Sequence, residues 1–367
     1  MSKRNDEKAY LVLDDGTVFE GGRFGAEGDS IGEMVFTTGM CGYVETLTDP
    51  SYYGQIIMQT FPMIGNYGIM EEDFEGESVC KGYIVRDYCD EPSNFRCGYD
   101  LDTFLKKKGI PGIYGLDTRE LTTILREKGV MNAMICSKPP KSFDKIKEYE
   151  IKDAVKSVTC AEEHIVKAEG ETKYKVTLVD YGAKKSIAKK LAMRGCEVRI
   201  VPSTTTASEI LAAEPDGIML SNGPGDPAEN VQTIREIKKM IKKVPIFGVC
   251  LGHQLMALSF GGKTYKMKYG HRGANQPVTV ISECENKGRS YITTQNHGYA
   301  VDPESLEGVG VMSFVNADDG TCEGIDYIGL DCFSVQFHPE ASAGPHDTGF
   351  LFDKFASMME EKKDAKR

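Results

Sequence analysis

Hydrophobic and polar residues alternate in short runs over the first third of the chain. The segments 10–13 and 17–20 alternate on either side of Asp14-Asp15-Gly16, and further β-prone runs lie at 35–38, 55–58 and 83–85. A period of two places alternate side chains on opposite faces, which is typical of strands with one buried face. The pattern predicts a strand-rich N-terminal domain.

One helical pattern interrupts these strands at about 119–128. Leu121, Ile124 and Leu125 recur at helical spacing, which places them on one face of a helix. Thr118 is expected to cap the N-terminus of this helix, and Gly129 is expected to end it.

From about residue 174, apolar runs alternate with helical periods. Strands are expected at 175–180, 197–202, 217–221 and 245–249, and helices at 184–195, 207–214 and 230–243. Such alternation predicts a mainly parallel sheet with helices on both faces and ligands at the carboxyl ends of its strands. Shorter strands at 278–281, 290–293, 309–315 and 332–337 precede a closing helix at 348–362. The predicted fold class is α/β: a strand-rich α/β domain followed by a doubly covered, mainly parallel sheet.

The length of the chain favours two domains. Its 367 residues compare with roughly 150 residues for a typical domain. Residues 138–173 contain two prolines, many charges and little periodicity, as is typical of a boundary. We expect a first domain over 1–150, a linker over 151–173 and a second domain over 174–367.

Charge and composition narrow the possible partners. The chain has 44 Lys and Arg against 55 Asp and Glu, a formal charge of −11, so a broad basic face for nucleic acid is not expected. No apolar run approaches the roughly 18 residues of a membrane span, and the charged start lacks the apolar segment of a signal peptide. We therefore expect a cytoplasmic protein that binds neither nucleic acid nor a membrane.

Eleven cysteines are scattered along the chain, and no Cys-x-x-Cys pair occurs. This distribution predicts free thiols in a reducing compartment, most of them small buried residues, rather than disulfides or a zinc cluster. No metal site is predicted.

One cysteine stands in a context that favours chemistry. Gly248-Val249-Cys250-Leu251-Gly252 lies between an apolar strand and an amphipathic helical segment. Small flanking residues allow a sharp strand-to-helix turn that exposes the central side chain. At a helix N-terminus a thiolate is favoured, and the N–H of Leu251 can stabilise an oxyanion. The alternative is an ordinary buried cysteine, but the turn pattern favours Cys250 as a nucleophile.

A thiol nucleophile requires a base that a third group orients. Among the six histidines, His338 follows an apolar strand and is succeeded by Pro339 and Glu340, so an imidazole and a carboxylate lie two residues apart at a strand end. We favour His338 as the base and Glu340 as its partner. His297 remains the alternative base.

A glycine-rich segment, Gly223-Pro224-Gly225-Asp226-Pro227, follows the strand expected at 217–221. The Gly-Lys-Ser/Thr continuation of a P-loop is missing, so phosphate binding is not predicted. The segment is better suited to bringing backbone N–H groups against a ligand or an oxyanion. The alternative is an ordinary turn.

Three of these segments together resemble the class I, triad-type glutamine amidotransferases. They are GPGDP, GVCLGHQ and VQFHPE, and they occur in the order found in that family. The resemblance implies that Cys250 attacks the side-chain amide of glutamine, that His338 moves the protons and that Glu340 orients His338. A γ-glutamyl thioester and ammonia would form, water would release glutamate, and the N–H groups of Leu251 and Gly225 would form the oxyanion hole.

The first domain is similar to one particular family, the small subunits of carbamoyl phosphate synthetases. The similar segments are GMCGYVETLTDPSYYGQI, FPMIGNYGI, GYIVRDY, SNFRC and GIPGIYGLDTRELTTILREKG, with VDYGAKKSI in the second domain. The resemblance implies a large partner subunit, docked partly on the first domain, that makes carbamoyl phosphate from bicarbonate and ATP for arginine and pyrimidine biosynthesis. ATP and Mg²⁺ are expected only on that subunit, and no cofactor is expected on this chain.

The same resemblance implies further site residues. Lys184 would lie close to the passage by which ammonia leaves. Two positions depart from the family pattern: Tyr299 stands where Phe can occur, and Phe337 precedes His338 where some relatives have Gly. Two alternatives remain, an amidotransferase serving another synthetase and a non-catalytic scaffold. Glutamine would be held by Ser51, Gly223, Gly225, Leu251, Gln254, Asn296, Gly298 and Tyr299.

Overall fold

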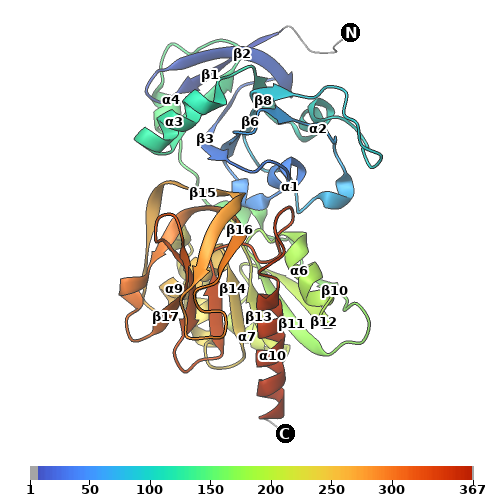
Figure 1. Ribbon diagram of the computed structural model, residues 1–367, viewed down its shortest axis with the longest axis vertical. Coiled ribbons are helices and arrows are strands. Elements are labelled where there is room, and N and C mark those ends of the chain that lie inside the picture. Colours follow the sequence, from blue (N-terminus) through green and yellow to red (C-terminus); the bar gives the residue numbers. More distant parts are fainter. Residues whose placement is uncertain (1–6, 366–367) are drawn as a thin grey trace. The chain divides into compact units, whose positions relative to one another are not determined.

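The computed structural model describes residues 7–365. Internal contacts divide the chain into two compact units between Ala154 and Val155, and each unit is described separately here (Figure 1). Among the helices of the described residues, none has the length and apolar character needed to cross a membrane.

The first unit contains a closed barrel in the order β1-β2-β8-β6-β4-β3-β9. Pairing is parallel from β3 through β4 and β6 to β8, and antiparallel elsewhere in the barrel. Two short strands, β5 (Met63–Ile64) and β7 (Asp87–Tyr88), pair separately. The barrel strands are β1 (Lys8–Leu13), β2 (Val18–Gly25), β3 (Ser30–Thr37), β4 (Gln55–Gln59), β6 (Gly82–Ile84), β8 (Pro111–Tyr114) and β9 (Met131–Cys136).

The helix expected at 119–128 is α3 (Thr118–Lys128), and Leu121 and Leu125 are its buried apolar residues. Its N-cap differs from the prediction, because the side chain of Asp117, not Thr118, accepts hydrogen bonds from the N–H groups of Arg119 and Glu120. The unit also contains α1 (Tyr43–Leu47), α2 (Leu101–Lys108), α4 (Asp144–Lys147) and the 3₁₀ helices η1 (Pro50–Tyr52) and η2 (Glu71–Asp73).

The second unit is built on a ten-stranded sheet in the order β10-β12-β11-β13-β14-β19-β18-β17-β15-β16. Pairing is parallel from β12 to β19 and antiparallel at both ends. Its strands are β10 (His164–Val166), β11 (Tyr174–Asp180), β12 (Cys196–Pro202), β13 (Gly217–Leu220), β14 (Ile246–Val249), β15 (Lys263–Val280), β16 (Ser290–Asp302), β17 (Gly310–Asn316), β18 (Cys322–Tyr327) and β19 (Cys332–Val335).

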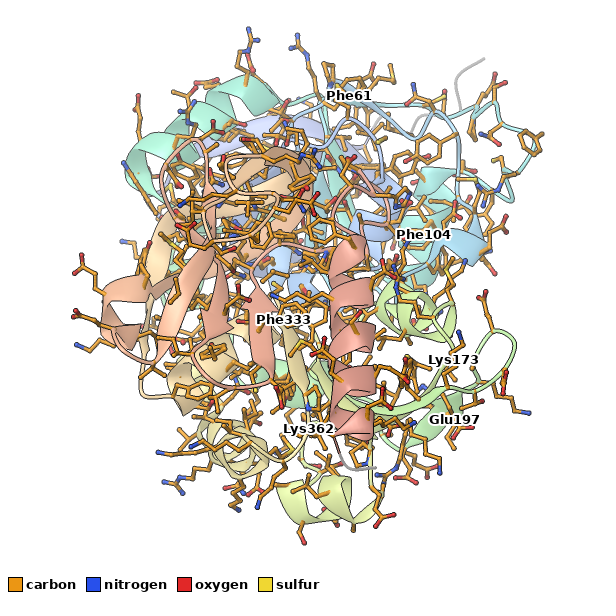
Figure 2. The ribbon with its side chains drawn as sticks, turned by 60° about the horizontal axis from the view of Figure 1, so that its bottom comes forward. Phe61, Phe104, Lys173, Glu197, Phe333 and Lys362 are labelled. Atoms are coloured by element: carbon orange, nitrogen blue, oxygen red, sulfur yellow. The ribbon has the colours of Figure 1, made fainter. Side chains whose placement is uncertain are left out.

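Helices cover both faces of this sheet because its central strands are apolar on both sides. On β13, Met219 belongs to one buried cluster with α6 and α10, while Ile218 and Leu220 belong to another with α7, α8 and α9. Phe333 of β19, labelled in Figure 2, stacks on Phe247 with ring centroids 4.3 Å apart. The elements are α5 (Ala154–Val158), α6 (Lys185–Ala192), α7 (Ala207–Ala212), α8 (Val231–Met240), α9 (Leu251–Ser259), α10 (Phe350–Asp364), η3 (Pro227–Glu229) and η4 (Pro303–Leu306).

Two segments differ from the sequence-based expectation. Residues 151–173, expected to be a linker, contain α5 and β10, and β10 pairs antiparallel with β12. Strands β15 and β16 are much longer than the short runs expected at 278–281 and 290–293. The first half of β15 is mostly exposed and rich in lysine, so it lacks the buried apolar face that makes a strand visible in a sequence.

Candidate active site

The sharp turn around Cys250 joins β14 to α9. Cys250 has a positive φ of 53° with ψ −104°, and its N–H donates to the carbonyl of Val335 at 2.9 Å. The glycines beside it are sterically required: a Cβ on Gly248 would lie 2.8 Å from the carbonyl oxygen of Gly252, and one on Gly252 would lie 2.3 Å from that of Leu220. The turn thus presents the thiol at the N-terminus of α9.

The thiol of Cys250 lies against strand β16. Cys250 is 2% exposed, and its Sγ lies 3.6 Å from the carbonyl oxygen of Asn296. Burial excludes water, and the helix N-terminus supplies a partial positive charge beside the sulfur. Both features favour a nucleophile that acts on an enclosed substrate.

His338 and Glu340 form a buried pair just beyond β19. The imidazole Nδ1 lies 2.6 Å from Glu340 Oε1, and neither side chain is more than 1% exposed. Burial alone lowers the pKa of His338, but the charge of Glu340 and then Cys250 outweigh it and raise the pKa to about 10. The imidazole is therefore protonated near neutral pH.

The other ring nitrogen of His338, Nε2, is buried, and no described group meets ordinary hydrogen-bond geometry there. Cys250 nevertheless raises the pKa of His338 both by its charge and as a side-chain hydrogen-bond partner. We interpret the two observations as a close but poorly aligned contact, which is common for catalytic groups before substrate binds. The structure thus brings together Cys250, His338 and Glu340.

Lys184 reaches the same carboxylate from the loop between β11 and α6. Its Nζ lies 3.2 Å from Glu340 Oε1 and donates to the carbonyl of Ser342 at 3.1 Å. Burial tends to raise the pKa of Glu340, but the charges of His338 and Lys184 lower it to about 2. Lys184 therefore helps to keep the orienting carboxylate ionised, a contact that the sequence alone did not indicate.

The structure gives the local contacts of several of the predicted glutamine-binding residues. Gln254 on α9 donates to the carbonyl of Tyr299 at 2.8 Å, and the carbonyl of Asn296 faces Cys250. Gly223 packs so closely that an added Cβ would lie 2.8 Å from Leu251 Cδ2. Gly298 lies on β16 between Asn296 and Tyr299. Gly225, with φ 88°, lies two residues beyond Gly223.

Ser51 belongs to the first unit. It lies in η1, where its N–H donates to the side chain of Asp49 at 2.9 Å. Its role in binding glutamine stays a prediction.

Two other histidines, His297 and His253, have different partners. His297 Nδ1 lies 2.9 Å from the carbonyl of Tyr299, and its Nε2 lies 3.1 Å from Gln295 Oε1. His253 Nδ1 lies 2.9 Å from the hydroxyl of Ser334, and burial lowers the pKa of His253 to about 3. Of the two candidate bases, His338 and His297, it is His338 that has a carboxylate partner at hydrogen-bond distance.

Asn222 is a site residue that the sequence reading missed. Its Oδ1 accepts from the N–H of Lys184 at 3.0 Å, and its Nδ2 donates to the carbonyl of Gly182 at 3.0 Å. It fixes the loop that carries Lys184. The available signal was its place just after β13, because polar residues at the carboxyl ends of parallel strands line ligand sites.

Comparison with known proteins defines the class of the second unit. Residues 177–358 match the family described as "Glutamine amidotransferase class-I". Residues 11–135 match "Carbamoyl-phosphate synthase small chain, CPSase domain", so both units have family matches.

Full-length relatives identify the particular family. Proteins described as "Carbamoyl phosphate synthase small chain" are 46% identical in Syntrophotalea carbinolica, covering 96% of this chain and 98% of the relative, and 50% identical in Fusobacterium nucleatum subsp. nucleatum, covering 95% and 98%. A third, from Clostridium perfringens, is 47% identical over 95% of this chain and 98% of the relative. The chain belongs to the carbamoyl phosphate synthase small chain family, and the predicted family and fold class are confirmed.

Proposed function

We propose that Cys250, His338 and Glu340 hydrolyse L-glutamine through a covalent thioester. The observation that carries this proposal is the buried His338–Glu340 pair at 2.6 Å, together with a cysteine in a positive-φ turn at the start of α9. As a member of its family, the chain is the glutaminase subunit that supplies ammonia for carbamoyl phosphate synthesis.

The first chemical step forms the thioester. Cys250, with its thiol proton transferred to His338, attacks the side-chain amide carbon of glutamine through sulfur, and the N–H groups of Leu251 and Gly225 stabilise the oxyanion. His338 then gives its proton to the departing nitrogen, so the C–N bond breaks and ammonia leaves. The protonated state that Glu340 imposes on His338 suits this donation.

The second step returns the enzyme to its starting state. Water attacks the thioester carbon while His338 accepts its proton, and the C–S bond breaks to release glutamate. We propose that Ser51, Gly223, Gly225, Leu251, Gln254, Asn296, Gly298 and Tyr299 hold the glutamine. Lys184 is proposed to lie by the exit of ammonia, in addition to contacting Glu340.

A small chain implies a large-chain partner. We propose that ATP and Mg²⁺ bind only to the large chain, which activates bicarbonate and phosphorylates carbamate, and that this chain needs no cofactor for glutamine hydrolysis. The product then serves arginine and pyrimidine biosynthesis. The proposal places the complex in the cytoplasm, where reducing conditions would keep the eleven cysteines as the free thiols seen here.

Replacing the nucleophile tests the mechanism. We expect Cys250→Ser to abolish glutamate release and glutamine-dependent synthesis with the large chain, because the hydroxyl is a far weaker nucleophile. Synthesis from added ammonia should persist. The matched control is Cys196→Ser: Cys196 is equally buried in the same unit, burial raises its pKa to about 12, and the variant should keep glutaminase activity. Persistent glutamine-dependent synthesis in Cys250→Ser would refute Cys250 as the nucleophile.

A further inference from the structure

A second group of buried ionisable side chains comes from strands β15, β16 and β18. His271 on β15 and His297 on β16 are direct cross-strand partners, and Glu323 comes from β18. His271 is 7% exposed, His297 is 5% exposed and Glu323 is 0% exposed. We name this group the His271–His297–Glu323 cluster.

The carboxylate of Glu323 is poorly paired for a fully buried group. Among the described residues no group meets ordinary hydrogen-bond geometry at either of its oxygens, and His271 and Asn316 are the polar side chains that act on it at closer range. Oε1 lies 3.3 Å from His271 Nδ1 and 3.8 Å from His297 Nε2, but without hydrogen-bond geometry. An unpaired carboxylate in the interior is strongly unfavourable, so the cluster needs a positive group at this point.

The ring of His297 directs a lone pair into the cluster. Its Nδ1 faces the carbonyl of Tyr299 at 2.9 Å and must carry the hydrogen, because a carbonyl can only accept. In the neutral ring, Nε2 then has no hydrogen, and it faces Gln295 Oε1 at 3.1 Å, a second electron-pair donor. The amide of Gln295 is oriented by its Nε2, which donates to Thr293 at 3.2 Å.

The ring of His271 also has one nitrogen paired outside the cluster and the other facing Glu323. Its Nε2 lies 2.9 Å from the carboxylate of Asp319, which places a hydrogen there. Its Nδ1 faces the amide nitrogen of Asn316 at 3.4 Å, and the amide is fixed because its Oδ1 accepts from the N–H of Asp318 at 2.9 Å. The amide of Asn316 suits a lone pair on Nδ1, whereas Glu323 Oε1 at 3.3 Å suits a hydrogen there, so a metal ion and a proton are the two candidates for this position.

We propose that this cluster binds a divalent metal ion, with Zn²⁺ the best fit, through His271 Nδ1, His297 Nε2 and a carboxylate oxygen of Glu323. The three donor atoms all lie within 4.8 Å of one another. Ligands about 2.0–2.1 Å from a tetrahedral zinc are roughly 3.3 Å apart, so two of the three spacings need little or no contraction. Two neutral imidazoles and a carboxylate are donors that Zn²⁺ accepts.

The outer contacts match those of metal-binding histidines. Such residues donate their second ring N–H to a carboxylate or a backbone carbonyl, as His271 does to Asp319 and His297 to Tyr299. Gln295 Oε1, 3.1 Å from His297 Nε2, offers a fourth donor atom. Since all three ligands are buried, the ion would be structural and would join β15, β16 and β18, although β16 and β18 are not neighbours in the sheet.

The alternative occupant of the cluster is a proton. If His271 were doubly protonated, it would pair with both Asp319 and Glu323 and no metal would be needed. The two occupants are distinguished by metal content, which is independent of glutaminase activity.

The experiment uses the full-length chain, purified without chelator or metal-affinity resin. We expect about one equivalent of Zn²⁺ by mass spectrometry, and saturable Zn²⁺ binding after the metal is stripped. Co²⁺ in its place should give the visible absorption of a four-coordinate site. Absence of saturable Zn²⁺ binding by the wild-type chain would overturn the proposal in favour of the proton.

Variants locate the site. Glu323→Gln keeps the shape of the side chain but removes its charge, and we expect Zn²⁺ affinity to fall at least about tenfold. Asp319 is 47% exposed, so Asp319→Asn should fold even if the buried variant does not, and it should weaken Zn²⁺ binding about 10–100-fold. The control is His164→Asn with His346→Asn, two histidines outside the cluster, which should bind as wild type. Equal affinity in Asp319→Asn and wild type, or lost binding in the control, would contradict the assignment.

Discussion

Glu340 contacts two cationic groups through a single oxygen. Oε1 lies 2.6 Å from His338 Nδ1 and 3.2 Å from Lys184 Nζ. In a buried site such charges interact strongly, since water does not screen them. The negative charge of Glu340 is therefore more important for the site than the shape of its side chain. Replacing Glu340 with a neutral residue of the same size separates the effect of charge from the effect of shape.

We expect Glu340→Gln to lower kcat for glutamine hydrolysis by roughly 10²–10⁴-fold, the usual contribution of general acid–base catalysis. The amide can still contact His338 but does not stabilise the imidazolium, so the pKa of His338 should fall from about 10. Steady-state kinetics and NMR titration of the imidazole measure the two effects. Glu236→Gln, a buried carboxylate on α8 that pairs with Lys239, is the control. An unchanged His338 pKa in Glu340→Gln would contradict this account.

The same pair predicts a pH dependence of stability. The pKa of His338 is raised from 6.5 to about 10 in the folded chain, so the folded chain binds a proton at His338 more tightly than the unfolded chain does. The stabilisation should be complete below pH 6.5 and should be lost as the pH rises towards about 10. Urea unfolding across this range should show a decreasing free energy of unfolding in the wild type and a smaller decrease in Glu340→Gln. Equal slopes would contradict the prediction.

The sequence predicted the three residues of the Cys250, His338 and Glu340 arrangement because each lies in a short local motif. It did not predict that Lys184 pairs with Glu340, or that His271, His297 and Glu323 meet. These contacts join segments far apart in the chain, and their distances depend on strand register, which no local pattern contains.

At the level of elements, the turn between β14 and α9 depends on close packing against β13. A Cβ on Gly252 would lie 2.3 Å from the carbonyl oxygen of Leu220, so one of the two elements must move. We expect Gly252→Ala to lower the free energy of unfolding by about 1–3 kcal/mol and to reduce kcat, since Cys250 moves with α9.

Denaturant unfolding and glutaminase assays measure the two effects. Gly349→Ala is the matched control, because the nearest atom to its added Cβ would be the carbonyl oxygen of His346 at 3.2 Å and its φ of −58° is ordinary. Wild-type kcat in Gly252→Ala would show that α9 tolerates the shift.

Apolar pattern explains which elements could be predicted. Strands β11 to β14 are buried runs and were expected close to their observed bounds. Helix α2 was missed because its eight residues include three consecutive lysines and only three buried side chains. The N-cap of α3 was placed one residue late because Asp117 and Thr118 are both good caps, and only the backbone geometry decides between them.

At the level of the whole molecule, the release of ammonia requires that glutamine hydrolysis depend on the large chain. Ammonia released without a partner is lost to solvent, mostly as ammonium. We expect the isolated chain to hydrolyse glutamine at least about tenfold more slowly than the complex, equivalent to roughly 1.4 kcal/mol in the barrier. Glutamate release measured with and without the large chain tests this, and equal turnover would contradict the coupling.

The two-part organisation of the chain was visible in its sequence because the rhythm of strands and helices changes near residue 174. The division itself falls between Ala154 and Val155, before the residues where that rhythm begins. Segment 155–173 is polar and irregular in sequence, yet β10 adds a strand to the edge of the second sheet. An edge strand with one neighbour needs little apolar surface, so composition alone could not assign it.

The backbone of Cys250 sets activity against folding stability. A positive-φ conformation with φ 53° and ψ −104° is unfavourable for any residue with a Cβ, by about 1–3 kcal/mol, whereas glycine adopts positive φ freely. Cys250→Gly should therefore be inactive yet more resistant to denaturant than Cys250→Ala. The strained backbone at residue 250 thus lowers the folding stability of the chain in return for a thiol fixed at the start of α9.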